Sequence, residues 1–266
     1  MTRVLRSELF KMRTTPGLWI VLAVTLVLTA LLGILPAFLV TGPDGHGRFI
    51  APMTVHHLRL LVGAGYQPAI LLAPVIGVLC ITSEYRQKTL SVTLLTTPRR
   101  EEVLVAKALT SAILGICLGV ASLVMVAAMG IPLFLTQGGT LSTLLHQVGP
   151  VVPGLLGAYA LLAIFGMGFG TLLRNQVAAV ICVLALTLVL EPILVLFVHG
   201  VLHADLNWFP SRSTAAVAGG LTRGTQSDNN LNGSLLSWWA GGLTLLAWGI
   251  GTAVVGYFTT FRRDVT

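Results

Sequence analysis

Residues able to do chemistry are few in this chain. The 266 residues include nine Asp and Glu, six His and three Cys. Cys80, Cys117 and Cys182 all fall inside apolar runs, with no CxxC and no metal-ligand spacing, so we expect buried, reduced thiols. No dense set of carboxylates accompanies the histidines, and we interpret them as polar interface residues rather than as metal ligands.

The motifs of ATP-binding and hydrolytic enzymes are absent from the sequence. Its three lysines, Lys11, Lys88 and Lys107, do not follow glycines, so there is no Walker A loop. Glu101–Glu102 is similar to the start of the EExxxR signature of intramembrane CAAX-type proteases, but Ala106 stands where that signature has arginine. We therefore expect a chain that is not an enzyme by itself, with an intramembrane enzyme as an alternative.

Composition places the chain in a membrane. Hydrophobic residues make up 55% and charged residues 9%, with a mean hydropathy of +0.89, whereas a soluble domain has about a quarter of its residues charged. A helix needs about 20 apolar residues to cross the hydrocarbon core. We predict an all-α, polytopic membrane protein with a single transmembrane domain, residues 1–266, and six transmembrane helices at about 18–40, 61–83, 107–135, 149–173, 177–199 and 235–259.

Basic residues indicate the orientation of these helices. With the N-terminus in the cytoplasm, twelve Lys and Arg fall on the inner side and four on the outer side, which is the bias typical of cytoplasmic loops. Both termini are then cytoplasmic, and topology explains the net charge of +7 without nucleic acid. Residues 2–13 mix basic and apolar residues at near-helical spacing, which predicts an interfacial helix whose basic residues face lipid phosphates. As a separate prediction, we place the chain in a cell inner or plasma membrane.

Three polar residues lie within predicted spans, where polar side chains usually face protein or a water-filled cavity. Tyr66 and Gln67 are near the start of the second span, beside Pro68. Glu191 is the one acidic residue deep in an apolar run, in the fifth span, and Pro192 follows it. We interpret Tyr66, Gln67 and Glu191 as candidates for a translocation path. Helix packing and a hydrogen-bonded structural carboxylate are the alternatives.

Two pairs of glycines have the spacing of close helix contacts. Gly115 and Gly119 lie in the third span, and Gly166 and Gly170 lie in the fourth. Small residues four apart let helix backbones approach within a membrane bundle. We predict helix packing at both pairs.

Residues 83–107, SEYRQKTLSVTLLTTPRREEVLVAK, form a charged interval between the second and third spans. Residues 89–97 read as a short helix closed by Pro98. Leu90, Leu94 and Leu95 give it a small apolar face with nothing of its own to pack against. The basic residues around it would pair with acidic residues of a partner protein or, alternatively, with anionic lipid headgroups.

Five pieces of sequence carry a family likeness: SELFKMRTTPGLW before the first span, residues 83–107 after the second, GFGTLLRNQVAAV between the fourth and fifth, LEPIL in the fifth and GYFTTFRRDV after the sixth. In this order and spacing the chain resembles the permease subunit of an ATP-binding-cassette (ABC) transporter of the type-2, exporter-like class. Residues 83–107 resemble that family's E-x-x-x-G-T signature, with Lys88 in place of glycine, followed by a short helix, a Pro-basic turn and a lysine.

The resemblance implies an assembly of two permeases and two ATPase subunits. ATP and Mg would bind the separate ATPase chain, and this chain would bind no cofactor. The second permease would be another copy, giving a homodimer, or a related chain. Residues 89–97 would be a cytosolic coupling helix seated in the ATPase. The contact residues would be Glu84, Arg86, Lys88, Thr89, Leu90, Leu94, Leu95, Pro98, Arg99 and Arg100.

We therefore expect the membrane-spanning subunit of an ABC exporter, driven by ATP hydrolysis on a partner chain. A polytopic scaffold or sensor without a transport role is the alternative. Three lysines among sixteen Lys and Arg, with abundant Ala, Gly, Leu and Val, are typical of a GC-rich bacterial genome.

Overall fold

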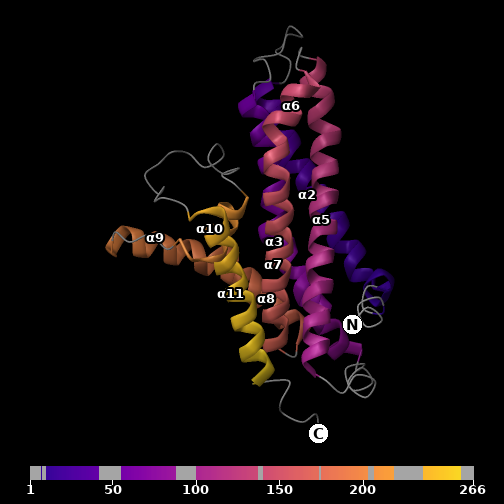
Figure 1. Cartoon of the computed structure of the whole chain (residues 1–266), viewed down its shortest axis with the longest axis vertical. Helices are drawn as coiled ribbons and strands as arrows, with labels where there is room; N and C mark the ends of the chain where they lie inside the picture. The colour runs from indigo at the N-terminus through magenta and orange to yellow at the C-terminus, as the bar shows by residue number, and fades with distance from the viewer. Residues whose placement is uncertain are drawn as a thin grey trace.

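The computed structural model describes residue 7 and residues 10–41, 55–87, 100–136, 140–173, 175–202, 207–218 and 236–258. Within these ranges every regular element is helical, as the predicted all-α class requires. The long helices α3 (Val55–Gln87), α5 (Arg100–Thr136) and α7 (Val152–Leu172) run along the long axis of the molecule (Figure 1). α2 (Pro16–Thr41) packs on α3 and α5, and α11 (Trp238–Gly256) packs on α7. α6 (Leu141–Val148) and the 3₁₀ turn η1 (Gly149–Val151) connect α5 to α7.

α7 is the central helix of the bundle, because it packs against α3, α5 and α11. Glycines make these contacts close. A Cβ added at Gly166 would collide with the carbonyl oxygen of Pro74 in α3, and one added at Gly115 of α5 would collide with the backbone of Tyr159 in α7. Backbone therefore meets backbone at these crossings, and the predicted packing role of the glycine pairs is confirmed.

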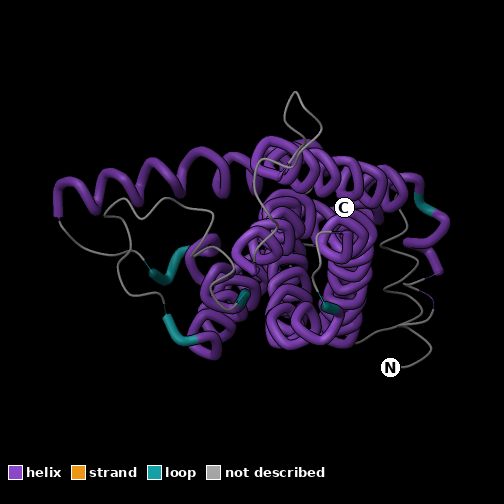
Figure 2. The backbone as a smooth tube through the Cα atoms, turned by 90° about the horizontal axis from the view of Figure 1, so that it is seen from above, coloured by secondary structure: helices purple, strands orange, loops and turns teal. Residues whose placement is uncertain are grey.

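The fifth predicted span is bent. α8 (Gln176–Ala185) packs against α3 and α7, and one turn of π-helix, η2 (Leu186–Leu190), joins it to α9 (Glu191–Leu202). Figures 1 and 2 show α9 running away from the bundle. The bend follows from local chemistry, because the π-turn and Pro192 both interrupt the regular hydrogen-bond ladder of the helix.

Among the residues that the structure describes, five helices are long and apolar enough to cross a membrane: Gly65–Ser83, Val103–Pro132, Gly149–Leu172, Gln176–Val198 and Trp238–Gly256. They correspond to the second to sixth predicted spans, within a few residues at each end. The first predicted span lies in α2, where the apolar helix with described side chains, Pro16–Leu32, is shorter. A sixth span therefore stays a prediction.

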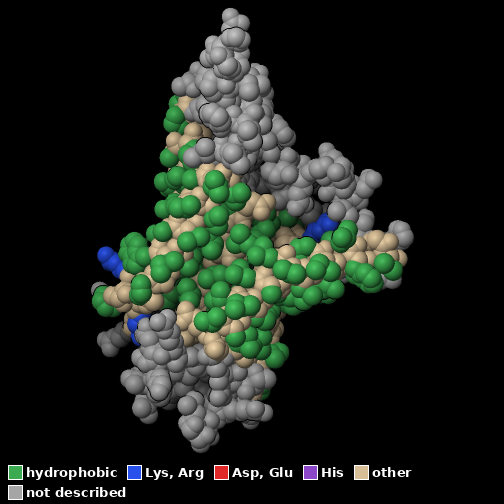
Figure 3. Space-filling view, turned by 180° about the vertical axis from the view of Figure 1, so that it is seen from behind, with side chains coloured by type: hydrophobic (Ala, Val, Ile, Leu, Met, Phe, Trp, Pro, Cys, Tyr) green, Lys and Arg blue, Asp and Glu red, His purple; other side chains and the backbone are tan. Residues whose placement is uncertain are grey.

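Burial differs strongly between these helices. In α3, 78% of the apolar stretch Gly65–Ser83 is buried inside the molecule. In α8–α9, the share for Gln176–Val198 is 17%. α3 is thus a core helix, whereas α8 and α9 turn most of their apolar side chains outward. Figure 3 shows hydrophobic side chains over most of the described part of one face, with few Lys or Arg. Such a surface suits contact with lipid tails or with another apolar protein surface.

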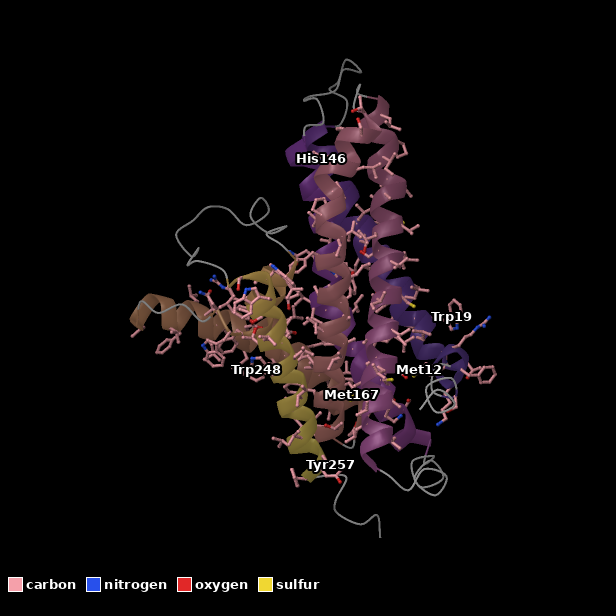
Figure 4. The ribbon with its side chains drawn as sticks, in the orientation of Figure 1. Met12, Trp19, His146, Met167, Trp248 and Tyr257 are labelled. Atoms are coloured by element: carbon pink, nitrogen blue, oxygen red, sulfur yellow. The ribbon has the colours of Figure 1, made fainter. Side chains whose placement is uncertain are left out.

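The two ends of the molecule differ in the elements they carry. α3 ends, α5 begins and α11 ends at the same end (Figure 1). His146, in α6, lies at the opposite end from Tyr257, which follows α11 (Figure 4). Of the predicted interfacial helix, residues 7 and 10–13 are described and are helical. Met12 is buried in the apolar core while Phe10 is exposed, so this segment has one buried side.

Candidate functional site

The predicted coupling segment lies mostly outside the described residues. Those not described include Lys88, Thr89, Leu90, Leu94, Leu95, Pro98 and Arg99. Glu84 and Arg86 belong to the last turn of α3 and Arg100 is the first residue of α5, and the backbone alone is described there. The structure shows the two helices that bracket the segment, and the roles of its residues stay predictions.

Lys107 joins these two helices inside the bundle. It lies on α5, about two turns after the start of that helix, and it is fully buried. Its Nζ donates a hydrogen bond to the carbonyl oxygen of Cys80 in α3 at 3.3 Å. An ammonium group is costly to bury without such contacts. The contact therefore couples the helix that enters the segment to the helix that leaves it.

The burial of Lys107 was missed from sequence, where it was only the lysine that begins the third span. A signal was present, because the residues one turn away on either side, Val103 and Ser111, are apolar or small. Both are buried. Among the described residues, the Ser111 hydroxyl oxygen has no hydrogen-bond partner. This face of α5 thus carries two polar groups, the ammonium and the hydroxyl, inside the bundle.

A second polar cluster forms where the bent helix α8–α9 meets α10 (Pro210–Val217). Glu191, the first residue of α9, is fully buried. Its Oε1 accepts hydrogen bonds from the backbone N–H and the hydroxyl of Ser211, at 2.8 and 2.5 Å. Ser211 is the second residue of α10, so the carboxylate caps the positive end of that helix. The positive charge of the next residue, Arg212, also acts on the carboxylate.

The structure brings together two of the three candidate path residues. The Tyr66 hydroxyl of α3 donates to the carbonyl oxygen of Ser211 at 3.3 Å, so Ser211 bridges Tyr66 and Glu191. Gln67 is exposed, whereas Tyr66 is buried. Ser211 was missed from sequence. The available signal was the Phe-Pro-Ser run, because proline is favoured at the first position of a helix.

A belt of hydrogen bonds ties four helices together near Tyr66. The carbonyl oxygen of Gly65 in α3 accepts from the hydroxyls of Ser122 in α5, at 3.1 Å, and Tyr159 in α7, at 2.9 Å. The Ser122 hydroxyl also lies 3.2 Å from that of Thr29 in α2. Pro68 follows within the next turn and disturbs the helical ladder there, which leaves carbonyl groups to be satisfied by side chains.

Aromatic residues cover the start of α10. The rings of Trp208 and Trp248 stack with centroids 6.1 Å apart and planes 6° apart. The indole Nε1 of Trp248 donates to the carbonyl oxygen of Trp208 at 2.9 Å, which joins α11 to the turn before α10 (Figure 4). Phe209 is buried in this cluster. Trp238 and Trp239 are exposed on α11, as expected for residues at a membrane interface.

Two apolar grooves follow α11 on its outer sides. One, of about 400 Å³, lies between α5, α7 and α11 and includes Met167 and Tyr257 (Figure 4). The other, of about 490 Å³, lies beside Trp208 and Trp248. Neither groove is lined by a candidate path residue. These two grooves are therefore distinct from the predicted translocation path.

Comparison with known proteins identifies the family. Residues 48–265 match the family described as ABC-2 family transporter protein. No curated protein matches the chain. The matched range runs from before α3 to beyond α11, and it contains the coupling segment, Lys107 and the Glu191–Ser211 cluster. With several apolar helices able to cross a membrane, this multi-pass chain is a membrane permease of an ABC transporter and belongs to the ABC-2 transporter family.

Proposed function

We propose that this chain forms the translocation pathway of an ABC exporter and that two copies of a separate ATPase chain drive it. ATP and Mg bind to the ATPase rather than to this chain. A second permease, another copy of this chain or a related one, completes the pathway in a bacterial inner or plasma membrane. The family match over residues 48–265 is the observation that carries the proposal.

The ATPase docks on the segment between α3 and α5. The sequence supports this place, because Leu90, Leu94 and Leu95 offer a small apolar face among basic residues. The structure supports it as well, because Lys107 connects the two bracketing helices. A push on the segment would move α3 and α5 together instead of bending one of them.

α3 is the element that carries this movement toward the candidate path. It is one helix of 33 residues from Val55 to Gln87. Glu84, near its end, is separated from Tyr66 by 18 residues, which is about 27 Å along a helix axis. Because Tyr66 contacts Ser211, a shift of α3 reaches the cluster that contains Glu191. The helix thus spans the distance between the ATPase and the candidate path.

Copurification tests the proposal. The full-length chain, purified in mild detergent from its native host, should bring down a chain with a Walker A loop and ATPase activity. Leu94→Asp with Leu95→Asp should abolish this association, because charge on the apolar face opposes docking. Thr96→Asp with Thr97→Asp is the matched control, since it adds the same two charges to polar positions of the same segment.

Two outcomes would contradict the proposal. A chain that inserts normally but brings down no ATPase would favour a scaffold or sensor. An ATPase that still binds the Leu94→Asp, Leu95→Asp variant would place the docking site elsewhere. Export itself requires a further measurement, because ATP should drive substrate into inside-out vesicles of an exporter.

The coupling role of Glu84 is a separate prediction. Glu84→Ala should leave membrane insertion and ATPase binding unchanged but uncouple transport from ATP hydrolysis, because the last turn of α3 would no longer transmit the push. Transport per ATP hydrolysed in reconstituted vesicles is the measurement. Unchanged transport at normal expression would rule this role out.

A further inference from the structure

α10 lies in a buried position although its buried side chains are small. Its residues from Ser213 to Val217 are all buried, and the helix packs against α7 and α11. A Cβ added at Gly154 of α7 would lie 2.5 Å from the carbonyl oxygen of Val217. One added at Gly241 of α11 would lie 2.6 Å from that of Ser213. Glycines on both neighbouring helices thus allow the backbone of α10 to fit.

Hydrogen bonds provide much of the contact that keeps α10 in this position. The α10 sequence PSRSTAAV contains no large apolar side chain, so its burial removes little apolar area per residue from water. Glu191 caps the start of the helix through Ser211. Thr244 of α11 donates to the hydroxyl of Ser213 at 2.7 Å. Each such bond contributes a modest net free energy, because bonds to water replace it when the helix moves away, so a helix held in this way can leave its site.

The bend before Glu191 can serve as the pivot of such a movement. η2 has π-helical hydrogen bonds, in which the Glu191 N–H reaches back to the carbonyl of Leu186. π-turns and helix prolines are places where helices change direction. Glu191 therefore directly follows the helix bend, and its carboxylate binds α10.

We propose that the Glu191 carboxylate and Ser211 form a latch that seats α10 and is released in one nucleotide state of the transport cycle. Glu191 is then a positioning residue rather than a substrate contact. Tyr66 links the latch to α3, the helix that reaches the coupling segment. The release step rests on the proposed function, whereas the latch itself can be tested without it.

Hydrogen exchange of residues 207–218 in the full-length chain in lipid nanodiscs tests the latch. Glu191→Ala should make the amides of α10 exchange about tenfold faster or more, because the two hydrogen bonds that the Glu191 side chain accepts are lost. Glu191→Gln should stay close to the parent chain, because its amide oxygen can accept the same bonds. Ser211→Ala removes the hydroxyl donor alone and should give a smaller increase.

Thr187→Val is the matched control. Thr187 is buried in η2 close to Glu191, but its hydroxyl donates within its own helix, to Val183. Its loss should leave exchange in α10 unchanged. Slow exchange in the Glu191→Ala and Ser211→Ala variants would overturn the latch, as would equally fast exchange in the Thr187→Val control.

The release step needs the copurified ATPase. Exchange in α10 of the parent complex should differ by about tenfold between the nucleotide-free and ATP-trapped states, and Glu191→Ala should abolish that difference. A merely structural cap would show the same exchange in both states, which would overturn the release. If no ATPase binds, the proposed function fails, while the nucleotide-free comparison still decides the latch.

Discussion

Lys107 and Glu191 are the two charged side chains that are fully buried in the described part of the chain. Each binds the backbone of another segment: Lys107 donates to the carbonyl of Cys80, and Glu191 accepts from the N–H of Ser211. Lys107 lies beside the coupling segment and Glu191 at the bend of α8–α9. Since buried charges rarely add stability over apolar residues, their value here is in fixing where one helix lies against another.

Lys107→Ala should destabilise the bundle. The variant loses the packing of three methylenes and the hydrogen bond to Cys80, which together should cost about 2 kcal/mol or more. Thermal unfolding of the purified chain in detergent measures this loss. Lys11→Ala is the control, because Lys11 is exposed, and it should unfold close to the parent temperature. Equal unfolding temperatures for all three chains would show that the Lys107 contact contributes nothing.

At the scale of elements, glycine residues allow α3 and α7 to cross closely. Gly166 of α7 meets the backbone of Pro74 in α3, and Gly77 of α3 meets the backbone of Ala163 in α7. Backbone atoms cannot rotate away as side chains can, so an added methyl must push the helices apart. The same exchange is harmless where a glycine faces open space, as at Gly251 of α11.

Gly166→Ala and Gly251→Ala should therefore change the free energy of unfolding in opposite directions. Alanine favours a helix over glycine by about 1 kcal/mol, and this gain should appear at Gly251. At Gly166 the collision should cost about 1–3 kcal/mol and outweigh the gain. Thermal unfolding of both variants, side by side, compares them. A stabilised Gly166→Ala variant would mean that α3 and α7 cross with more room than the structure shows.

Local sequence patterns predicted the helices more accurately than they predicted the contacts between the helices. Apolar run length located the apolar stretches of α3, α5, α7, α8–α9 and α11 within a few residues, because membrane spans are defined by composition over about 20 residues. Pro192 was a sequence signal for a bend near Glu191, but the π-turn of η2 was not predictable, since Leu186–Leu190 is as apolar as the helical turns around it. The partner of Glu191 lies 20 residues further along the chain, and no local rule pairs them.

The two ends of the whole molecule should face different compartments. Twelve Lys and Arg fall with the predicted inner side and four with the outer side. A reversed protein would place the larger set outside, against the usual bias of cytoplasmic loops. The same orientation would place the α3–α5 connection where a cytosolic ATPase can reach it. The charge bias and the proposed docking site thus depend on one topology.

Cysteine labelling from one side of the membrane tests that topology. In a chain with Cys80, Cys117 and Cys182 replaced by alanine, His146→Cys should react with an impermeant maleimide added outside intact cells. Arg13→Cys, which is also at an exposed position, should react only after the membrane is opened. The reverse pattern would show that the protein is inserted in the opposite orientation, with the proposed docking segment outside the cytosol. Labelling of both positions from outside would require an even number of spans between them, in place of the three predicted spans.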